Sequence, residues 1–124
     1  MAKVIGLGGI FFKARDPKAL ASWYATHLGL SIEGWGGTRF DEDEQRAGYT
    51  AWCPFAEDTT YFAPSTQPYM INYRVDDLDA LLAQLRAAGV QVDDRVEDSE
   101  YGRFGWIMDP EGTRIELWQP PVAG

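Results

Sequence analysis

The stretch YGRFGWIMDPEGTRIELWQPP, residues 101–121, contains a tight turn between two apolar segments and decides the fold. In the turn Asp-Pro-Glu-Gly, residues 109–112, Pro110 fixes the φ angle that the first central position of a type I turn requires. Gly112 can adopt the left-handed conformation that closes a bulged hairpin. The flanking segments are therefore predicted to be the two antiparallel strands of a β-hairpin.

One carboxylate, Glu116, lies inside the second of these strands. Because side chains alternate between the faces of a strand, Ile115 and Leu117 share one face and Glu116 lies on the other, with Arg114 and Trp118. Two interpretations of this polar and aromatic face remain open. It is either the solvated outside of a half-buried sheet or the wall of a binding site.

Composition indicates one globular domain that does not bind polyanions. A chain of 124 residues with 45% hydrophobic and 14% aromatic residues can bury one core but not two independent ones. The formal net charge of −8 would repel nucleic acid and anionic membranes, so neither is an expected partner. The same charge suits a cationic small molecule.

The cysteine content and the first residues bear on the cellular setting. Cys53 is the single cysteine, which excludes an intrachain disulfide and a cysteine-rich zinc site. The opening MAKVIGLGGIFF lacks an apolar run of the length of a signal peptide or a membrane span. We therefore expect a cytoplasmic protein.

An internal repeat organises the chain. Residues 9–33 and 70–93 each contain an alternating strand, an Asp, an amphipathic helix, a Gly and a further alternating segment. Asp16 is the predicted N-cap of the first helix, whereas Asp76 and Asp77 remain alternatives for the second. When the two strands are superposed, six residues point away from the helices: Gly9, Phe11 and Lys13 in the first copy, and Met70, Asn72 and Arg74 in the second.

The second half of each copy extends the repeat. Residues 49–64 resemble the closing hairpin in having two apolar segments about an acidic turn. Each copy is thus predicted to be a β-α-β-β-β module, about residues 1–64 and about 65–121, within one domain of residues 1–124. In the first copy, residues 34–48 connect the segment 9–33 to the segment 49–64. This connection is rich in Gly and acidic residues and is predicted to be a loop.

The duplicated module, together with RDPKALASWYATHLGL in the first copy and DPEGTRIELW at the end, resembles the vicinal oxygen chelate (VOC) superfamily. That superfamily includes glyoxalase I, extradiol dioxygenases and bleomycin resistance proteins. The resemblance implies an α+β fold in which eight strands from two βαβββ modules curl into a cup. It also implies a cup that holds either a divalent metal with a substrate or a metal-free ligand, and chains that pair as homodimers.

The resemblance implies that Glu116 stands where metal-binding members have a carboxylate ligand. The three other ligand positions fall on residues that suit a metal poorly: Gly9, Met70, and either Tyr61 or Phe62. A catalytic metal needs about three protein ligands. We therefore expect no metal cofactor.

A cup without a metal would still be a small-molecule site. Its predicted lining combines aromatic walls with a few polar groups, as is usual for such pockets: Phe11, Lys13, Trp52, Tyr61, Met70, Asn72, Arg74, Trp106 and Glu116. Arg103 is an additional ligand-binding candidate, in a loop at the rim. Arg74 and Glu116 as a buried ion pair are the structural alternative to a ligand-orienting role for Arg74.

Two function classes follow. One is a metal-free, glyoxalase-like protein that binds a small molecule, such as an antibiotic or a metabolite, in the cup. The alternative is an enzyme of the glyoxalase or dioxygenase type, a lyase or isomerase, in which Glu116 acts as a general base or as a metal ligand.

Overall fold

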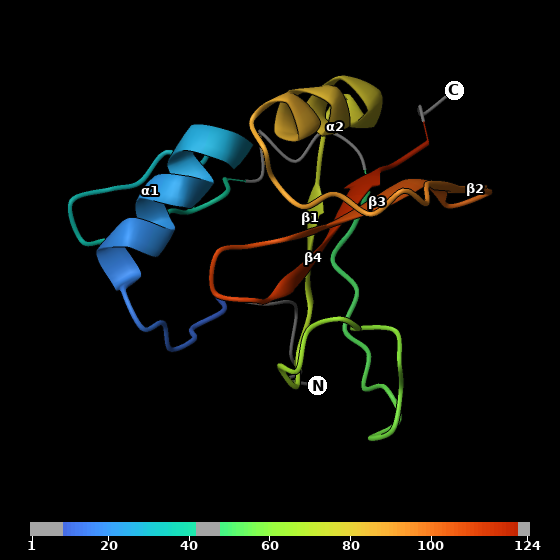
Figure 1. The fold of residues 1–124 in the computed structure, drawn as a ribbon, viewed down its shortest axis with the longest axis horizontal. Helices are drawn as coiled ribbons and strands as arrows, with labels where there is room; N and C mark the ends of the chain where they lie inside the picture. Colours follow the sequence, from blue (N-terminus) through green and yellow to red (C-terminus); the bar gives the residue numbers. More distant parts are fainter. Residues whose placement is uncertain (1–8, 42–47, 122–124) are drawn as a thin grey trace, which may run out of the picture.

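The computed structural model describes residues 9–41 and 48–121 (Figure 1). Within them the chain forms two helices and four strands, in the following order: α1 (Pro17–Leu28), β1 (Ile71–Arg74), α2 (Leu78–Ala87), β2 (Glu97–Ser99), β3 (Gly102–Met108) and β4 (Arg114–Gln119). No helix in these ranges is long and apolar enough to cross a membrane.

The four strands form one sheet in the order β1-β4-β3-β2. Strands β3 and β4 pair antiparallel around residues 109–112, which confirms the predicted hairpin. Gly112 has a φ of +79°, the left-handed conformation for which glycine was expected. Strand β1 joins the other side of β4 in parallel, and this register sets Asn72 opposite Glu116.

Helix α2 covers one face of the sheet (Figure 1). The core between them is apolar: Leu78, Leu82 and Leu85 from the helix, and Ile107, Ile115 and Leu117 from the strands. Asp77 rather than Asp76 caps the helix, because its carboxylate accepts the Ala80 N–H at 3.1 Å. The sequence-predicted apolar stripe is thus the side that α2 presents to the sheet.

Helix α1 is tied to the hairpin turn by polar contacts. The Tyr24 hydroxyl donates to the buried Asp109 carboxylate at 2.8 Å. Burial, reinforced by Tyr73 and Asp109, raises the pKa of Tyr24. The Glu111 carboxylate accepts the backbone N–H groups of Arg15 at 2.8 Å and Asp16 at 3.1 Å. The turn that closes the second module therefore also holds the helix of the first.

The α+β class and one βαβββ module are as predicted, but the sheet has four strands rather than eight. The described part of the first module contains α1 and no strand. Phe11 and Trp52, expected on its strands, are 92% and 79% exposed. An alternating sequence becomes a strand only when a neighbouring strand takes up its backbone hydrogen bonds and buries one of its faces. Within residues 9–41 and 48–121, no strand pairs with these segments.

Candidate functional site around Glu116

The sheet has a second face, opposite α2, and Glu116 lies on it. Alternation places Asn72, Phe104, Trp106, Glu116 and Trp118 together on this side, which we call the open face. The register brings Glu116 between Asn72 of β1 and Trp106 of β3. Residues from three strands thus meet at one carboxylate.

Glu116 is 9% exposed and accepts three hydrogen bonds. Its Oε2 atom accepts from the Tyr61 hydroxyl at 2.5 Å and from the indole N–H of Trp106 at 2.9 Å. Its Oε1 atom accepts from the Asn72 side-chain amide at 2.8 Å. A buried carboxylate is costly unless it is paired or hydrogen-bonded, and these three donors provide that stabilisation.

The Tyr61 side chain is held in place beside Glu116 by other aromatic rings. Its ring stacks on Phe55 with centroids 5.6 Å apart and meets the Trp106 ring edge-on at 6.2 Å. Burial, and then the hydrogen bond to Glu116, raise the pKa of Tyr61. The phenol therefore keeps its proton and acts as a donor to the carboxylate.

Trp106 is fully buried and is flanked by two guanidinium groups. Arg95 lies 4.7 Å and Arg114 5.3 Å from its ring centroid, within the range of cation–π attraction. Arg114 is in turn paired with Asp93 at 3.3 Å. The pKa of Asp93 is lowered, first by the Arg95 backbone N–H and then by Arg114. These contacts fix the indole that donates to Glu116.

The far end of the open face is built around Trp118. Its ring stacks on Phe104 at 6.0 Å and meets Tyr49 at 5.0 Å. Gly48, with a φ of +93°, approaches so closely that a Cβ atom there would lie 2.7 Å from Cδ of Arg74. The segment entering Tyr49 therefore passes directly over this end of the sheet.

Most of the sequence-predicted site residues line one wide hollow, which extends beyond the open face to residues of α1 and α2. Its volume, about 3040 Å³, exceeds the roughly 300–1,000 Å³ of ordinary ligand pockets, so it is an open depression rather than a closed cavity. Six of the predicted residues line it: Phe11, Trp52, Met70, Asn72, Arg74 and Glu116. Tyr61 and Trp106 contact Glu116 directly.

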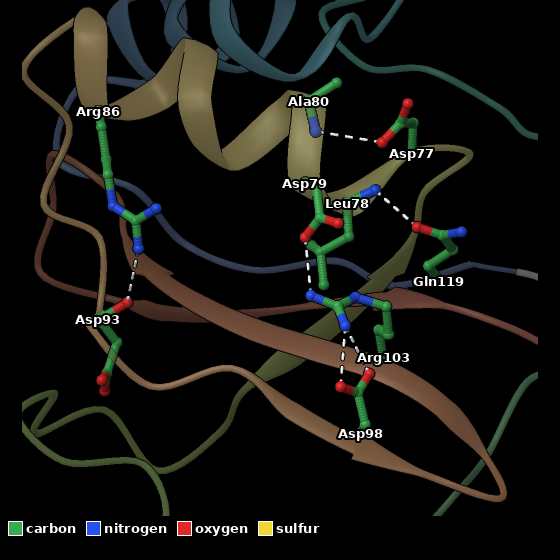
Figure 2. Close-up of polar contacts among 9 residues, drawn as sticks. All are labelled: Asp77, Leu78, Asp79, Ala80, Arg86, Asp93, Asp98, Arg103 and Gln119. Carbon is green, nitrogen blue, oxygen red and sulfur yellow. Dashed lines mark hydrogen bonds and ion pairs between the residues drawn. The ribbon is translucent and has the colours of Figure 1, made fainter.

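Two predicted residues lie elsewhere. Lys13 lies beside Arg15 and Glu111, near the hairpin turn. Arg103 is on the α2 side of the sheet, where it binds Asp79 at 2.7 Å and Asp98 at 2.8 Å (Figure 2). The hydrogen bond to Asp79 is the largest contribution to its raised pKa. The sequence already indicated that Arg103 does not share the face of Trp106. The two residues are three apart on one strand, and residues an odd number apart lie on opposite faces.

Sequence reasoning did not assign a role to Arg95 or Arg114. Arg114 was detectable, since it shares the face of Glu116 two residues away. Arg95 was not, because it precedes β2 in a segment without clear alternation.

The ion pair of Arg74 with Glu116, the structural alternative for these two residues, is not the arrangement found. Across residues 9–41 and 48–121, the side chains that donate hydrogen bonds to Glu116 are Tyr61, Asn72 and Trp106. Arg74 stands opposite Trp118, two positions further along the parallel register. The carboxylate is therefore satisfied by neutral donors.

The donor set around Glu116 does not fit a divalent metal. Its three neighbours turn an O–H and two N–H groups toward it, so protons surround its oxygens, and the Trp106 indole is a donor only. Among the described residues no group of three His, Cys, Asp or Glu side chains comes together.

Comparison with solved structures supports the fold. TnmS3, an antibiotic binding protein from Streptomyces sp. CB03234, is 20% identical over 86% of this chain and 88% of its own, with a TM-score of 0.52. Oxidase ChaP-H2 is 19% identical over 90% of each chain, with a TM-score of 0.53. At such identities the likeness concerns the fold alone.

A glyoxalase/bleomycin resistance protein from Streptomyces sp. CB03234 is 39% identical, but over only 40% of this chain and 42% of its own, with a TM-score of 0.37. The chain thus matches less than half the length of that protein. A comparison with curated protein sequences gave no significant match.

The family model described as a glyoxalase-like domain matches residues 9–118, nearly the whole chain. That range includes α1, all of the βαβββ module except the last residue of β4, and Glu116 with its three hydrogen-bond donors. The chain therefore belongs to the glyoxalase-like domain family of the VOC superfamily.

Proposed function

We propose that this protein binds a small molecule on the open face of its sheet, with Glu116 as the polar anchor and without a metal. One observation carries the proposal. A carboxylate that is only 9% exposed is held by a phenol, an amide and an indole, inside a wall of aromatic rings. A few convergent polar groups in aromatic surroundings are typical of a small-molecule site.

The ligand class follows from the same chemistry. Phe55 and Tyr61 offer flat apolar surface, with the Trp106 ring buried behind Tyr61, and Glu116 offers hydrogen-bond acceptors beside them. TnmS3, which has a similar fold, is described as an antibiotic binding protein. We extend that class of ligand, an antibiotic, to this chain.

The central test is a binding screen that uses Glu116 itself as the control. Antibiotics and metabolites that bind the folded state should raise the melting temperature by mass action. Glu116→Gln should lose these shifts, whereas Glu33→Gln, at an exposed position away from the open face, should keep them. Hits that survive Glu116→Gln would place the site elsewhere. Conversion of a hit to a product, lost in Glu116→Gln, would favour the enzyme instead.

The absence of a metal is a separate part of the proposal. Gly9 and Met70 stand at two ligand positions of the metal-binding relatives, and the donors around Glu116 are occupied with its oxygens. Elemental analysis should find no stoichiometric Zn, Ni, Mn or Fe. Near one metal per chain, removed by Glu116→Ala, would contradict the proposal.

We further propose that two copies pair and that the first module then completes an eight-stranded cup. Two observations support this. Aromatic residues of the first module, Phe11 and Trp52 among them, are exposed, and β1 has a single neighbouring strand in the described part of the chain. Light scattering should give a homodimer at micromolar concentration. A mass near 13.9 kDa, that of one chain, would contradict it.

A further inference from the structure

Tyr61 differs from the other two donors to Glu116 in how it is held. Asn72 belongs to β1 and Trp106 to β3, so both are fixed by the sheet. Tyr61 belongs to a turn segment, residues 61–64, that pairs with no strand of the described chain. Of the three donors it is the one whose backbone is not held by strand pairing among the described residues.

The surroundings of the Tyr61 side chain are those of a bound aromatic molecule. Phe55 stacks on one face of its ring with an interplanar angle of 24°, and the Trp106 ring meets it at 89°. Its hydroxyl donates to Oε2 of Glu116, which also accepts the Trp106 N–H. The protein thus already holds one phenol, its own, in a site made of two rings and a carboxylate.

We propose that Tyr61 is a displaceable internal occupant, and that the ligand carries an aromatic hydroxyl that takes its place on Glu116. The inference rests on the proposed function and narrows it to hydroxyarenes. Binding would exchange one O–H donor for another on the same oxygen. The carboxylate therefore would not lose a hydrogen bond in the exchange.

Other ligand chemistries fit this position less well. A ketone or an ether has no proton to donate, so it would leave Oε2 with the Trp106 N–H alone. A phenolate or carboxylate would be repelled by Glu116. A cation would face Arg95 and Arg114, whose guanidinium carbons lie 4.7 and 5.3 Å from the Trp106 ring. A neutral aromatic hydroxyl avoids all three penalties, despite the net charge of −8.

The test compares naphthol with methylnaphthalene, which has a similar shape but no O–H group, by calorimetry and Trp fluorescence. The wild type should bind naphthol at least about tenfold more tightly, equivalent to about 1.4 kcal/mol. Tyr61→Phe should bind naphthol about tenfold more tightly again, because the competing hydroxyl is gone. Tyr73→Phe removes a phenolic O–H on the opposite face and should leave the affinity unchanged.

The outcomes separate this inference from the proposed function. Unchanged or weaker naphthol binding by Tyr61→Phe, or equal binding of methylnaphthalene by the wild type, overturns the displacement of Tyr61 by a hydroxyarene. If other compounds still bind in a Glu116-dependent manner, the proposed function stands. If nothing binds, both are overturned. Circular dichroism verifies folding. If Tyr61→Phe is unstable, Tyr61→Leu, which removes the ring as well as the hydroxyl, must show the tighter naphthol binding.

Discussion

Replacing Glu116 by Ala tests the carboxylate cluster through stability, independently of any ligand. The change leaves three donors without their acceptor, but the donors differ in exposure. Asn72 is exposed and Tyr61 half-buried, so both can turn to water. Trp106 is 0% exposed, and its indole N–H then has no replacement acceptor.

The magnitude follows from that one orphaned group. A buried donor left without a partner costs about 1–3 kcal/mol. For a chain of 124 residues, each kcal/mol lowers the melting temperature by roughly 3–5 °C, between the values for smaller and larger domains. Glu116→Ala should therefore lower it by about 3–15 °C. Glu116→Gln keeps an acceptor oxygen for Trp106, so it should lower the melting temperature by less than Glu116→Ala does.

Urea unfolding followed by Trp fluorescence measures the free energy of unfolding directly. Glu33→Ala, at an exposed carboxylate, is the matched control and should change it by less than about 0.5 kcal/mol. If Glu116→Ala is as stable as Glu33→Ala, the hydrogen bond from Trp106 does not contribute as argued. The reasoning would also be refuted if Glu116→Gln were the less stable of the two Glu116 variants.

Three further predictions concern the fold that supports the site. Tyr24→Phe removes the hydroxyl bound to Asp109 and should cost about 1.5–3 kcal/mol in urea unfolding, while the exposed Tyr101→Phe should be near neutral; equal losses would argue against the contact. Burial raises the pKa of Tyr73 from 10.0 to about 12, so the unfolded chain ionises first, and stability should hold below pH 10.0 and fall as pH rises toward 12. An absorbance titration that shows all tyrosines ionising together near pH 10.0, before unfolding, would contradict this. Gly102→Ala places a Cβ against a carbonyl of β4 at a φ of +113°, so calorimetry should show a lower melting temperature, whereas an unchanged value would exclude the clash.

The closing hairpin and both helices were predictable because their signals are local. Pro110 and Gly112 define a turn within four residues, and Asp16 caps a helix one residue away. The alternation of β4 correctly separated Glu116 from Ile115 and Leu117. Such signals depend only on backbone geometry and on neighbours close in sequence.

The strands expected in the first module show where local signals fail. Residues 9–14 alternate in the manner of a strand, yet in this structure they pair with no strand of the described chain. Alternation predicts which side chains share a face if a strand forms. It does not provide the partner whose backbone groups a strand requires.

The sequence by itself determined that Glu116 lies in the second strand of a hairpin, on the face opposite to Ile115 and Leu117. Only the tertiary structure decided which groups meet it: Tyr61 is 55 residues away in the chain and Asn72 is 44. The tertiary structure also decided that Arg103 forms ion pairs with Asp79 and Asp98, and that Tyr24 donates a hydrogen bond to Asp109. The physical reason is that the period of a strand is fixed by the backbone alone, whereas a hydrogen bond between distant residues depends on how separate elements pack.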